Sequence, residues 1–234
     1  IEPVNYMYAV PYEWYEKYKV RKYGAHGTSH RYIAETLKHE LGEDNLDIIS
    51  CHLGNGGSIT AIKDEKCVDT SMGFTPHAGI MMGTRSGDID VSIVPYIMEK
   101  EGKSASEIMN DLNKKSGFLG ISELSSDSRD IENGIKEGNE KCILAENMYV
   151  NSIVKYISQY YVLLGHVDAI AFTAGIGENS PETRKQVIEK LACLGIKIDE
   201  EKNNIRGKFA KISTDDSTVA VYVVPTDEEL MIAR

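Results

Sequence analysis

The spacing of hydrophobic and polar residues changes along this chain in a way that separates strands from helices. Between residues 46 and 70, short apolar runs follow one another with polar turns between them. Asn55-Gly56 is typical of a tight hairpin turn, and Asp64-Glu65 makes a second turn. The pattern predicts a three-stranded antiparallel meander, with strands at 46–53, 58–63 and 66–70.

Helical spacing, with apolar residues three or four positions apart, is found on both sides of this meander. Before it, Ile33, Leu37 and Leu41 form such a stripe. Thr28 or Ser29 would cap the helix that carries this stripe, because a hydroxyl can accept a hydrogen bond from the first helical N–H groups. The sequence therefore predicts a helix that leads into the first strand.

The second part of the chain combines helical stretches with short strand-like runs. Ser104 followed by Glu107 forms a capping box, and Ser180 before Pro181 is typical of another helix start. Apolar and β-branched runs predict strands at 169–173 and 219–224. Helices are expected at 91–100, 104–117, 139–165, 181–195 and 226–234.

This order of elements, βββαβαβα with inserted helices, predicts an α/β domain. It resembles the ribonuclease-H-like (actin-like ATPase) domain that is repeated in sugar kinases, actin and Hsp70-type ATPases. At 234 residues, the chain is long enough for one large domain or for two small ones.

Composition and charge narrow the classes of partner. The formal net charge is −10, from 36 acidic against 26 basic residues, whereas nucleic acids and acidic membranes attract a basic surface. We therefore expect no nucleic-acid partner, and the lack of an apolar run of about 18 residues argues against a membrane span. The 4 cysteines are scattered without a metal-ligand spacing, which favours a cytoplasmic location.

Glycine-rich stretches in four places carry residues that handle anions. Glycine lets backbone N–H groups approach oxygen anions closely, and His and Arg supply donors for developing negative charge. Together they predict a site that holds several phosphates and one transferring group. The stretches lie at 24–30, 52–58, 83–88 and 174–179.

Two of these stretches also have a purely structural interpretation. The run 52–58 is a hairpin turn by its Asn-Gly pair, and the same turn would form a nest of N–H donors for phosphate. The sequence lacks the P-loop pattern of Walker-type kinases. The run 174–179 contains only half of a dinucleotide fingerprint, so we interpret it as a loop where a nucleoside packs on glycine backbone.

Arg85 and His26 are the candidates for contact with the transferring group. An isolated Arg is usually a solvated surface residue, but Arg85 lies among small residues, and Asp88 and Asp90 could orient it. A positioned Arg accelerates phosphoryl transfer by roughly 10³- to 10⁵-fold. A lone His between glycines is more often structural, and Glu228 is either a helix-terminal acid or a carboxylate for Mg²⁺.

The sequence resembles the acetate kinases in motifs that follow the family's order along the chain. The matching stretches are 23–30, 52–58, 69–76, 82–90, 172–179 and 228–234. The resemblance implies reversible phosphoryl transfer between ATP and acetate, which gives acetyl phosphate and ADP.

The resemblance also implies roles for individual residues. His26 and Arg85 match the residues that steady the transferring phosphoryl group, and Glu228 matches the carboxylate that holds Mg²⁺ or Mn²⁺. The phosphate-binding loop corresponds to His52, Leu53, Gly54, Asn55 and Gly56. The remaining nucleotide contacts correspond to Asp127, Ser128, Arg129, Gly175, Ile176, Gly177, Glu178 and Asn179.

By the same resemblance, residues 1–234 are expected to be the second, nucleotide-binding domain of a two-domain homodimeric kinase, without its first domain. Asp227 stands where the family pattern has Asn, and Ala25 where many members have Phe. The alternatives are a propionate kinase and a non-catalytic nucleotide-binding or dimerisation module. We expect the chain alone to be weakly active or inactive.

The predicted domain divides into four parts along the chain. They are an entry segment with a helix (1–45), the meander (46–70), an active-site loop with inserted helices (71–138), and a long helix, a βαβ unit and the start of a final helix (139–234).

Overall fold

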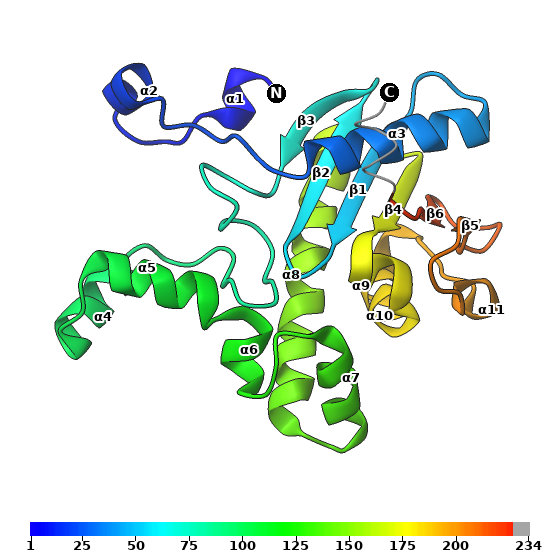
Figure 1. Ribbon diagram of the computed structural model, residues 1–234. Coiled ribbons are helices and arrows are strands. Elements are labelled where there is room, and N and C mark those ends of the chain that lie inside the picture. The colour runs from blue at the N-terminus through cyan, green and yellow to red at the C-terminus, as the bar shows by residue number, and fades with distance from the viewer. Residues whose placement is uncertain (227–234) are drawn as a thin grey trace.

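A six-stranded mixed sheet forms the centre of the molecule (Figure 1), and the computed structural model describes residues 1–226. The strands are β1 (Asp47–Leu53), β2 (Gly57–Lys63), β3 (Lys66–Thr70), β4 (Ala169–Thr173), β5 (Ala210–Lys211) and β6 (Ala220–Val223). They lie in the order β3-β2-β1-β4-β6-β5. β2 is antiparallel to both β1 and β3, so the predicted meander is confirmed. β4 lies parallel to β1 and to β6, as the predicted order requires.

Helices cover both faces of this sheet (Figure 1). α3 (Gly27–Leu41) lies on one face, and α8 (Glu140–Leu164), the long helix predicted from the sequence, lies on the other. Within residues 1–226, no helix has both the length and the apolar character needed to cross a membrane. The other helices are α1 (Pro3–Tyr6), α2 (Tyr12–Tyr18), α4 (Ile93–Glu101), α5 (Ala105–Lys114), α6 (Gly117–Ser122), α7 (Ser128–Lys136), α9 (Ala174–Asn179), α10 (Pro181–Lys190), the 3₁₀ turn Ala192–Leu194 and α11 (Glu200–Asn203).

The alternation of side chains along β1 decides which of them face which helix. The odd-numbered residues of 49–53 belong to the core between the sheet and α8. Ile48 packs instead with Leu37 in the core beneath α3. By the same alternation, Ser50 and His52 face α3, and this places polar chemistry beside an otherwise apolar layer.

The start of α3 differs from the prediction. The helix begins after His26, and neither Thr28 nor Ser29 caps it. The reason is tertiary, because the Ser29 hydroxyl lies 2.8 Å from Nδ1 of His52 and is used there. The final helix, expected over 226–234, falls outside the described residues except for its first position.

The end of α5 also differs. The helix begins with the predicted capping box of Ser104 and Glu107 but stops at Lys114. Gly117 instead begins α6 with a φ of 62°. A Cβ at this glycine would lie 2.1 Å from the carbonyl oxygen of Met82. The close approach and the positive φ together require glycine here, and they separate α5 from α6.

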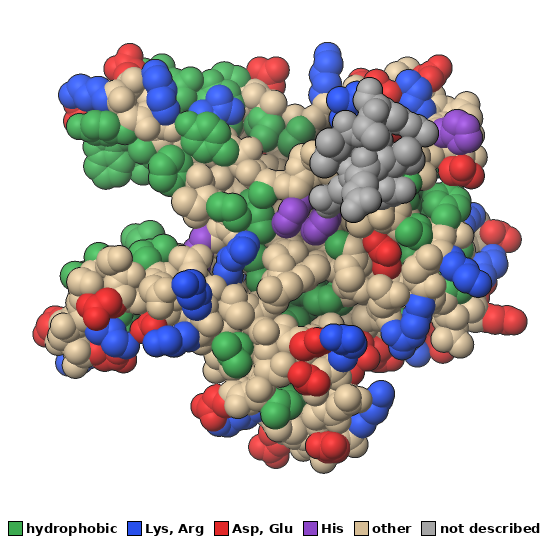
Figure 2. All heavy atoms as spheres, viewed as in Figure 1, with side chains coloured by type: hydrophobic (Ala, Val, Ile, Leu, Met, Phe, Trp, Pro, Cys, Tyr) green, Lys and Arg blue, Asp and Glu red, His purple; other side chains and the backbone are tan. Residues whose placement is uncertain are grey.

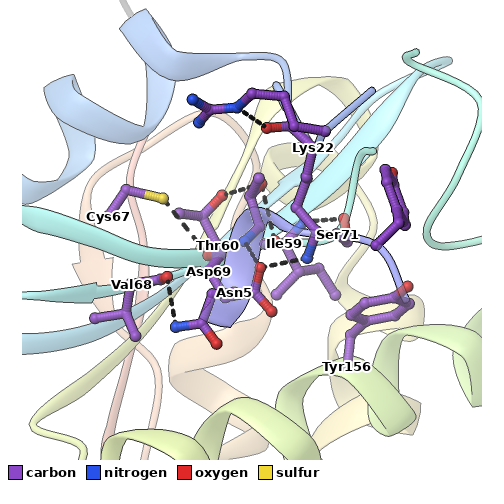
Figure 3. Close-up of polar contacts among 12 residues, drawn as sticks. Asn5, Lys22, Ile59, Thr60, Cys67, Val68, Asp69, Ser71 and Tyr156 are labelled. Atoms are coloured by element: carbon purple, nitrogen blue, oxygen red, sulfur yellow. Dashed lines mark hydrogen bonds and ion pairs between the residues drawn. The ribbon is translucent and has the colours of Figure 1, made fainter. Parts of the chain in front are cut away.

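The N-terminal segment is fastened to the edge strand β3. Figure 3 shows Asn5 and Lys22 beside this strand. Nδ2 of Asn5 donates to the carbonyl oxygen of Val68 (3.1 Å), and Lys22 forms an ion pair with Asp69. In Figure 1, α1–α2 and α4–α5 extend away from the sheet as two arms.

Candidate active site

His26 and His52, both predicted site residues, are in direct contact. Their rings stack with centroids 4.0 Å apart and planes 14° apart. Nδ1 of His26 lies 2.9 Å from the hydroxyl of Ser58. His26 has a φ of 60°, and such left-handed backbone is uncommon for a residue with a Cβ and often found at functional sites. The start of α3 thus brings one candidate histidine over the other.

Burial makes the inner histidines of this cluster neutral. His52 and His30 are 8% and 4% exposed. Burial, together with neighbouring histidines, lowers the pKa of each to about 3. His30 contacts the hydroxyls of Ser50 (2.8 Å) and Ser58 (2.7 Å). His30 lies at the end of the predicted stretch 24–30, but no role was predicted for it, although its four-residue spacing from His26 was a usable signal.

The turn between β1 and β2 carries predicted phosphate-binding residues. The N–H of Gly54 donates to the carbonyl oxygen of Gly56 (3.1 Å). A Cβ on Gly54 would stand 3.9 Å from Nε2 of His52, so that ring is directed toward the turn. The N–H of Gly83 donates to the carbonyl oxygen of Asn55 (3.0 Å), and a Cβ on Gly83 would lie 2.0 Å from Asn55 Oδ1. The turn and the 83–88 loop are therefore in close contact.

Arg85 reaches the same turn from the 83–88 loop. Its Nη1 lies 3.4 Å from the place of a Cβ on Gly56, and it donates to the carbonyl oxygen of Pro76 (2.8 Å). The expected orientation by Asp88 and Asp90 is wrong, because each accepts a backbone N–H bond of 2.8 Å instead. A carbonyl oxygen does not neutralise a guanidinium, so Arg85 keeps its charge for an anion. In Figure 2, histidine side chains are visible near the centre of the view, with basic side chains close to them.

A cavity of about 500 Å³ lies beside this turn. It brings together the β1–β2 turn, the start of α7 and helix α9, which are far apart in the sequence. Predicted residues that line it are Gly54, Asn55, Asp127, Ser128, Arg129, Gly175, Ile176 and Asn179. Its other lining residues, Ser126, Glu132, Ser180 and Arg206, were not predicted.

At the start of α7, Asp127 is the N-cap and accepts a hydrogen bond from the backbone N–H of Arg129 (2.9 Å). Nε of Arg129 also donates to the carboxylate of Asp127 (3.0 Å). These hydrogen bonds lower the pKa of Asp127 to about 2. The Arg129 side chain is 84% exposed, so this ion pair is a weak surface contact.

The stretch 174–179 is the helix α9 rather than the predicted loop. Gly177 allows the helix to pack closely on the sheet, since a Cβ there would lie 3.3 Å from the carbonyl carbon of Phe172 in β4. Oε1 of Glu178 accepts two backbone hydrogen bonds of 2.9 Å, one of them from Thr226. Gly177 and Glu178 therefore support the helix and do not line the cavity.

Other predicted residues are also outside the cavity. Leu53 is fully buried in the core against α8. His52 stacks on His26, and Gly56 lies beside Arg85. Glu228 lies outside the described residues. A second cavity, of about 530 Å³, opens beside α3 and the β2–β3 edge. Gly24, Ala25, Gly27 and His30 of the predicted stretch 24–30 line it, but none of the residues given an individual role does.

Comparison with known proteins decides the family. A profile of the Acetokinase family matches residues 1–234. The chain belongs to the acetokinase family. An acetate kinase from Phocaeicola vulgatus is 60% identical over 230 residues, which cover 97% of this acetokinase chain and 58% of that protein.

Solved structures agree with this assignment. The crystal structure of Porphyromonas gingivalis acetate kinase has a TM-score of 0.97 at 48% identity and covers 100% of this chain and 59% of that one. A propionate kinase from Francisella tularensis subsp. tularensis has a TM-score of 0.95 at 44% identity, with coverage of 100% and 60%. These matches confirm the predicted fold class. This acetokinase chain therefore spans well under two thirds of the length of these relatives.

Proposed function

We propose that this protein is an acetate kinase and that residues 1–234 form its second, nucleotide-binding domain. The proposed reaction is the reversible transfer of a phosphoryl group from ATP to the carboxylate of acetate. Family membership and the relatives named acetate kinase support this proposal. Because the chain spans 58% of the Phocaeicola relative, we assign to it the nucleotide and the transferring phosphoryl group, not the whole acceptor pocket.

One observation carries the proposal. Residues of three segments that are far apart in the sequence line one cavity: Gly54 and Asn55, the 127–129 segment implied by the family resemblance, and Gly175, Ile176 and Asn179. The turn that forms one wall of this cavity also touches Arg85 and faces His52. A nucleotide site and a cationic donor for its terminal phosphate are therefore adjacent.

The arrangement suits the chemistry of phosphoryl transfer, which needs positioning and charge stabilisation rather than a covalent protein intermediate. We assign the adenosine to the walls formed by α7 and α9. Backbone N–H groups of the 54–56 turn would contact the phosphates. Arg85 and His26 would steady the negative charge of the transferring group.

Mg²⁺, with Mn²⁺ as the alternative, is proposed to bind Glu228 and the phosphates of the nucleotide. Within residues 1–226, no group of three or more His, Cys, Asp or Glu side chains is placed to hold a metal ion. A nucleotide-bound Mg²⁺ usually takes only one or two carboxylates, with phosphate and water oxygens completing the shell, so the single Glu228 carboxylate fits as its protein ligand. When bound, the ion would neutralise phosphate charge.

The experiment is calorimetric titration of this chain with Mg-ADP. Arg129→Ala and Asn179→Ala should each weaken binding several-fold, because both side chains line the cavity. Lys197→Ala is the matched control, since Lys197 forms an exposed ion pair with Asp216 and does not line the cavity. Failure of the wild-type chain to bind, or equal affinity in all variants, would contradict the assigned site.

Propionate kinase is the second candidate, favoured by the Francisella structure at a TM-score of 0.95. The two functions differ only in the acceptor acid. Comparing kcat/KM for acetate and propionate in the full-length protein separates them. A higher value for acetate supports the proposal, and a higher value for propionate replaces it.

We further propose that the protein is a cytoplasmic homodimer that associates through this domain. All 4 cysteines are free in the structure, as suits a reducing compartment. α8 exposes Leu144 and Val162, and exposed apolar side chains on one element suit a subunit contact. Light scattering should give twice the mass of the chain. A non-catalytic dimerisation module would give the same mass but no kinase activity at full length.

A further inference from the structure

A chain of polar side chains runs from β1 to His26. Oγ of Ser50 lies 2.8 Å from Nδ1 of His30, and Nε2 of His30 lies 2.7 Å from Oγ of Ser58. Oγ of Ser58 lies in turn 2.9 Å from Nδ1 of His26. Both serines are 0% exposed and His30 is 4% exposed. These groups must therefore satisfy one another.

The hydrogen atoms available to Ser50 and His30 decide the direction of this chain. His30 is neutral at physiological pH, since burial lowers its pKa to about 3, so it carries one ring proton. A proton on Nδ1 would point at Ser50 Oγ and would leave the Ser50 hydroxyl hydrogen without an acceptor. Within residues 1–226, the structure gives that hydroxyl one hydrogen-bond partner, Nδ1 of His30. An unmade hydrogen bond of a buried hydroxyl is costly, so Ser50 donates to Nδ1 and His30 carries its proton on Nε2.

The direction continues to His26. Because Nε2–H of His30 donates to Ser58, the Ser58 hydroxyl hydrogen is directed at Nδ1 of His26. Nδ1 of His26 then accepts, and the neutral ring carries its proton on Nε2, the nitrogen remote from Ser58. An N–H on that nitrogen is the kind of donor that stabilises charge on a transferring phosphoryl group.

We propose that His30 is a positioning residue that acts through Ser58 to hold His26 in the tautomer with its proton on Nε2. The use of that N–H on a phosphoryl group rests on the proposed function, whereas the tautomer itself does not. The tautomer of His52 can be assigned independently by the same argument. Its Nδ1 contacts the hydroxyl of Ser29 (2.8 Å), which is also 0% exposed, so His52 carries its proton on Nε2 as well.

The direct test is nuclear magnetic resonance of this chain with ¹⁵N-labelled histidine. Two-bond ¹H–¹⁵N spectra distinguish a protonated from an unprotonated ring nitrogen, and the chain contains only 6 histidines to assign. Near neutral pH, we expect His26 and His30 both to carry one proton, on Nε2. A proton on Nδ1 of either ring, or two protons on His26, would overturn the proposal.

Substitution of Ser50 tests whether the relay, the hydrogen-bonded chain from Ser50 through His30 and Ser58, sets the tautomer of His26. Ser50→Ala removes the first donor without touching His26, so the ratio of the Nε2–H to the Nδ1–H form of His26 should fall by about fivefold or more. Ser50→Thr keeps the hydroxyl and should restore the ratio. Ser213→Ala is the matched control, because Ser213 is another fully buried serine and accepts from the N–H of Val221 (3.0 Å). An unchanged ratio in Ser50→Ala would contradict the proposal that this chain sets the His26 tautomer.

Kinetics of the full-length protein separate this proposal from the proposed function. Ser50→Ala should lower kcat several-fold and leave the KM for nucleotide unchanged, whereas a general loss of structure would alter both. If the His26 tautomer shifts in Ser50→Ala as expected but the wild-type protein transfers no phosphoryl group, the proposed function is wrong and the proposed role of His30 is supported. If the protein is an active kinase and the tautomer does not shift, the relay alone fails.

Discussion

The two sides of the candidate site are built on different physical principles. On the side of α3, His30 and His52 are 4% and 8% exposed and are held by buried serine hydroxyls. On the side of the 500 Å³ cavity, the proposed nucleotide side, Arg129 is 84% exposed and pairs with Asp127 two residues away. Buried hydrogen bonds fix geometry before a ligand arrives, whereas an exposed ion pair rearranges at little cost. We infer that the groups at the transferring phosphoryl are preorganised and that nucleotide contacts form on binding.

The largest expected effect is at the preorganised side. Arg85→Ala removes the guanidinium beside Gly56 and should reduce kcat for acetyl phosphate formation by roughly 10³-fold or more. Mg-ADP affinity should change little, because Arg85 does not line the nucleotide cavity. Steady-state kinetics at full length and calorimetry of the chain measure the two quantities. A large loss of affinity with modest loss of kcat would reverse the division between the two sides.

Acid should destabilise the histidine cluster. The pKa of His30 falls from 6.5 to about 3 on folding, so the unfolded chain binds more protons between these values. Stability is therefore present above pH 6.5 and is lost as pH falls toward 3, by up to about 5 kcal/mol for one histidine. Urea unfolding across this range should show the loss, and His30→Gln should reduce its slope. Identical slopes in both proteins would contradict a buried neutral His30.

Behind the exposed nucleotide contacts lies a rigid support, Arg184. It is 0% exposed and donates to the carbonyl oxygens of Gly177 (2.9 Å), Asn203 (2.7 Å) and Ile205 (2.9 Å). Arg184→Met keeps the bulk but leaves these oxygens unpaired, so the free energy of unfolding should fall by about 3 kcal/mol or more. Arg31→Met, at an exposed ion pair, is the control and should change it by less than about 0.5 kcal/mol. Similar small effects in both variants would show that α9 does not depend on this support.

Glu146 of α8, whose carboxyl contacts α10, should show the opposite pH dependence. Burial raises its pKa from 4.5 to about 7, and its carboxyl contacts the hydroxyl of Thr183 (2.8 Å). The folded chain then binds more protons than the unfolded chain between these values. Its contribution to stability is lost as pH rises from 4.5 to 7, by about 3 kcal/mol. Glu146→Gln should remove this loss in urea unfolding near pH 7, and a variant less stable than wild type there would contradict it.

The smallest effect on stability is expected at Arg129. Arg129→Ala breaks an ion pair that is exposed and local, so the free energy of unfolding should change by less than about 0.5 kcal/mol. Mg-ADP affinity should nevertheless fall several-fold. Calorimetry and urea unfolding of the same preparation measure both. A stability loss above 1 kcal/mol would place Arg129 on the preorganised side of the comparison.

Much of the fold could be predicted because its signals are local. Asn55-Gly56 predicts a hairpin, the capping box at Ser104 predicts a helix start, and the short apolar runs between turns in 46–70 predict the meander. The glycine-rich segments of the candidate site were found for the same reason, since a glycine-rich run is a property of a few adjacent residues, whereas residues 127–129 followed only from the family resemblance. The cavity that collects them confirms their proximity but not their function.

The rest depended on contacts between distant residues. Ser29 has the sequence signature of a helix cap, but its hydroxyl contacts Nδ1 of His52, which lies on β1. Asp88 reads as the partner of Arg85 but accepts the N–H of Gly79. Arg206 lines the cavity because the segment after α11 folds back so that the Arg206 guanidinium donates to the carbonyl oxygen of Asn179. No local sequence pattern predicts this long-range contact.

The most direct test of the central claim is a titration of the ¹⁵N-labelled chain with Mg-ADP, followed through its backbone amide signals. We expect one saturable process that shifts the signals of Gly54, Ser128, Gly175 and Asn179 together, since these residues share one cavity. Shifts confined to Ala25, Arg31 and the other residues of the second cavity would place the nucleotide elsewhere and contradict the account.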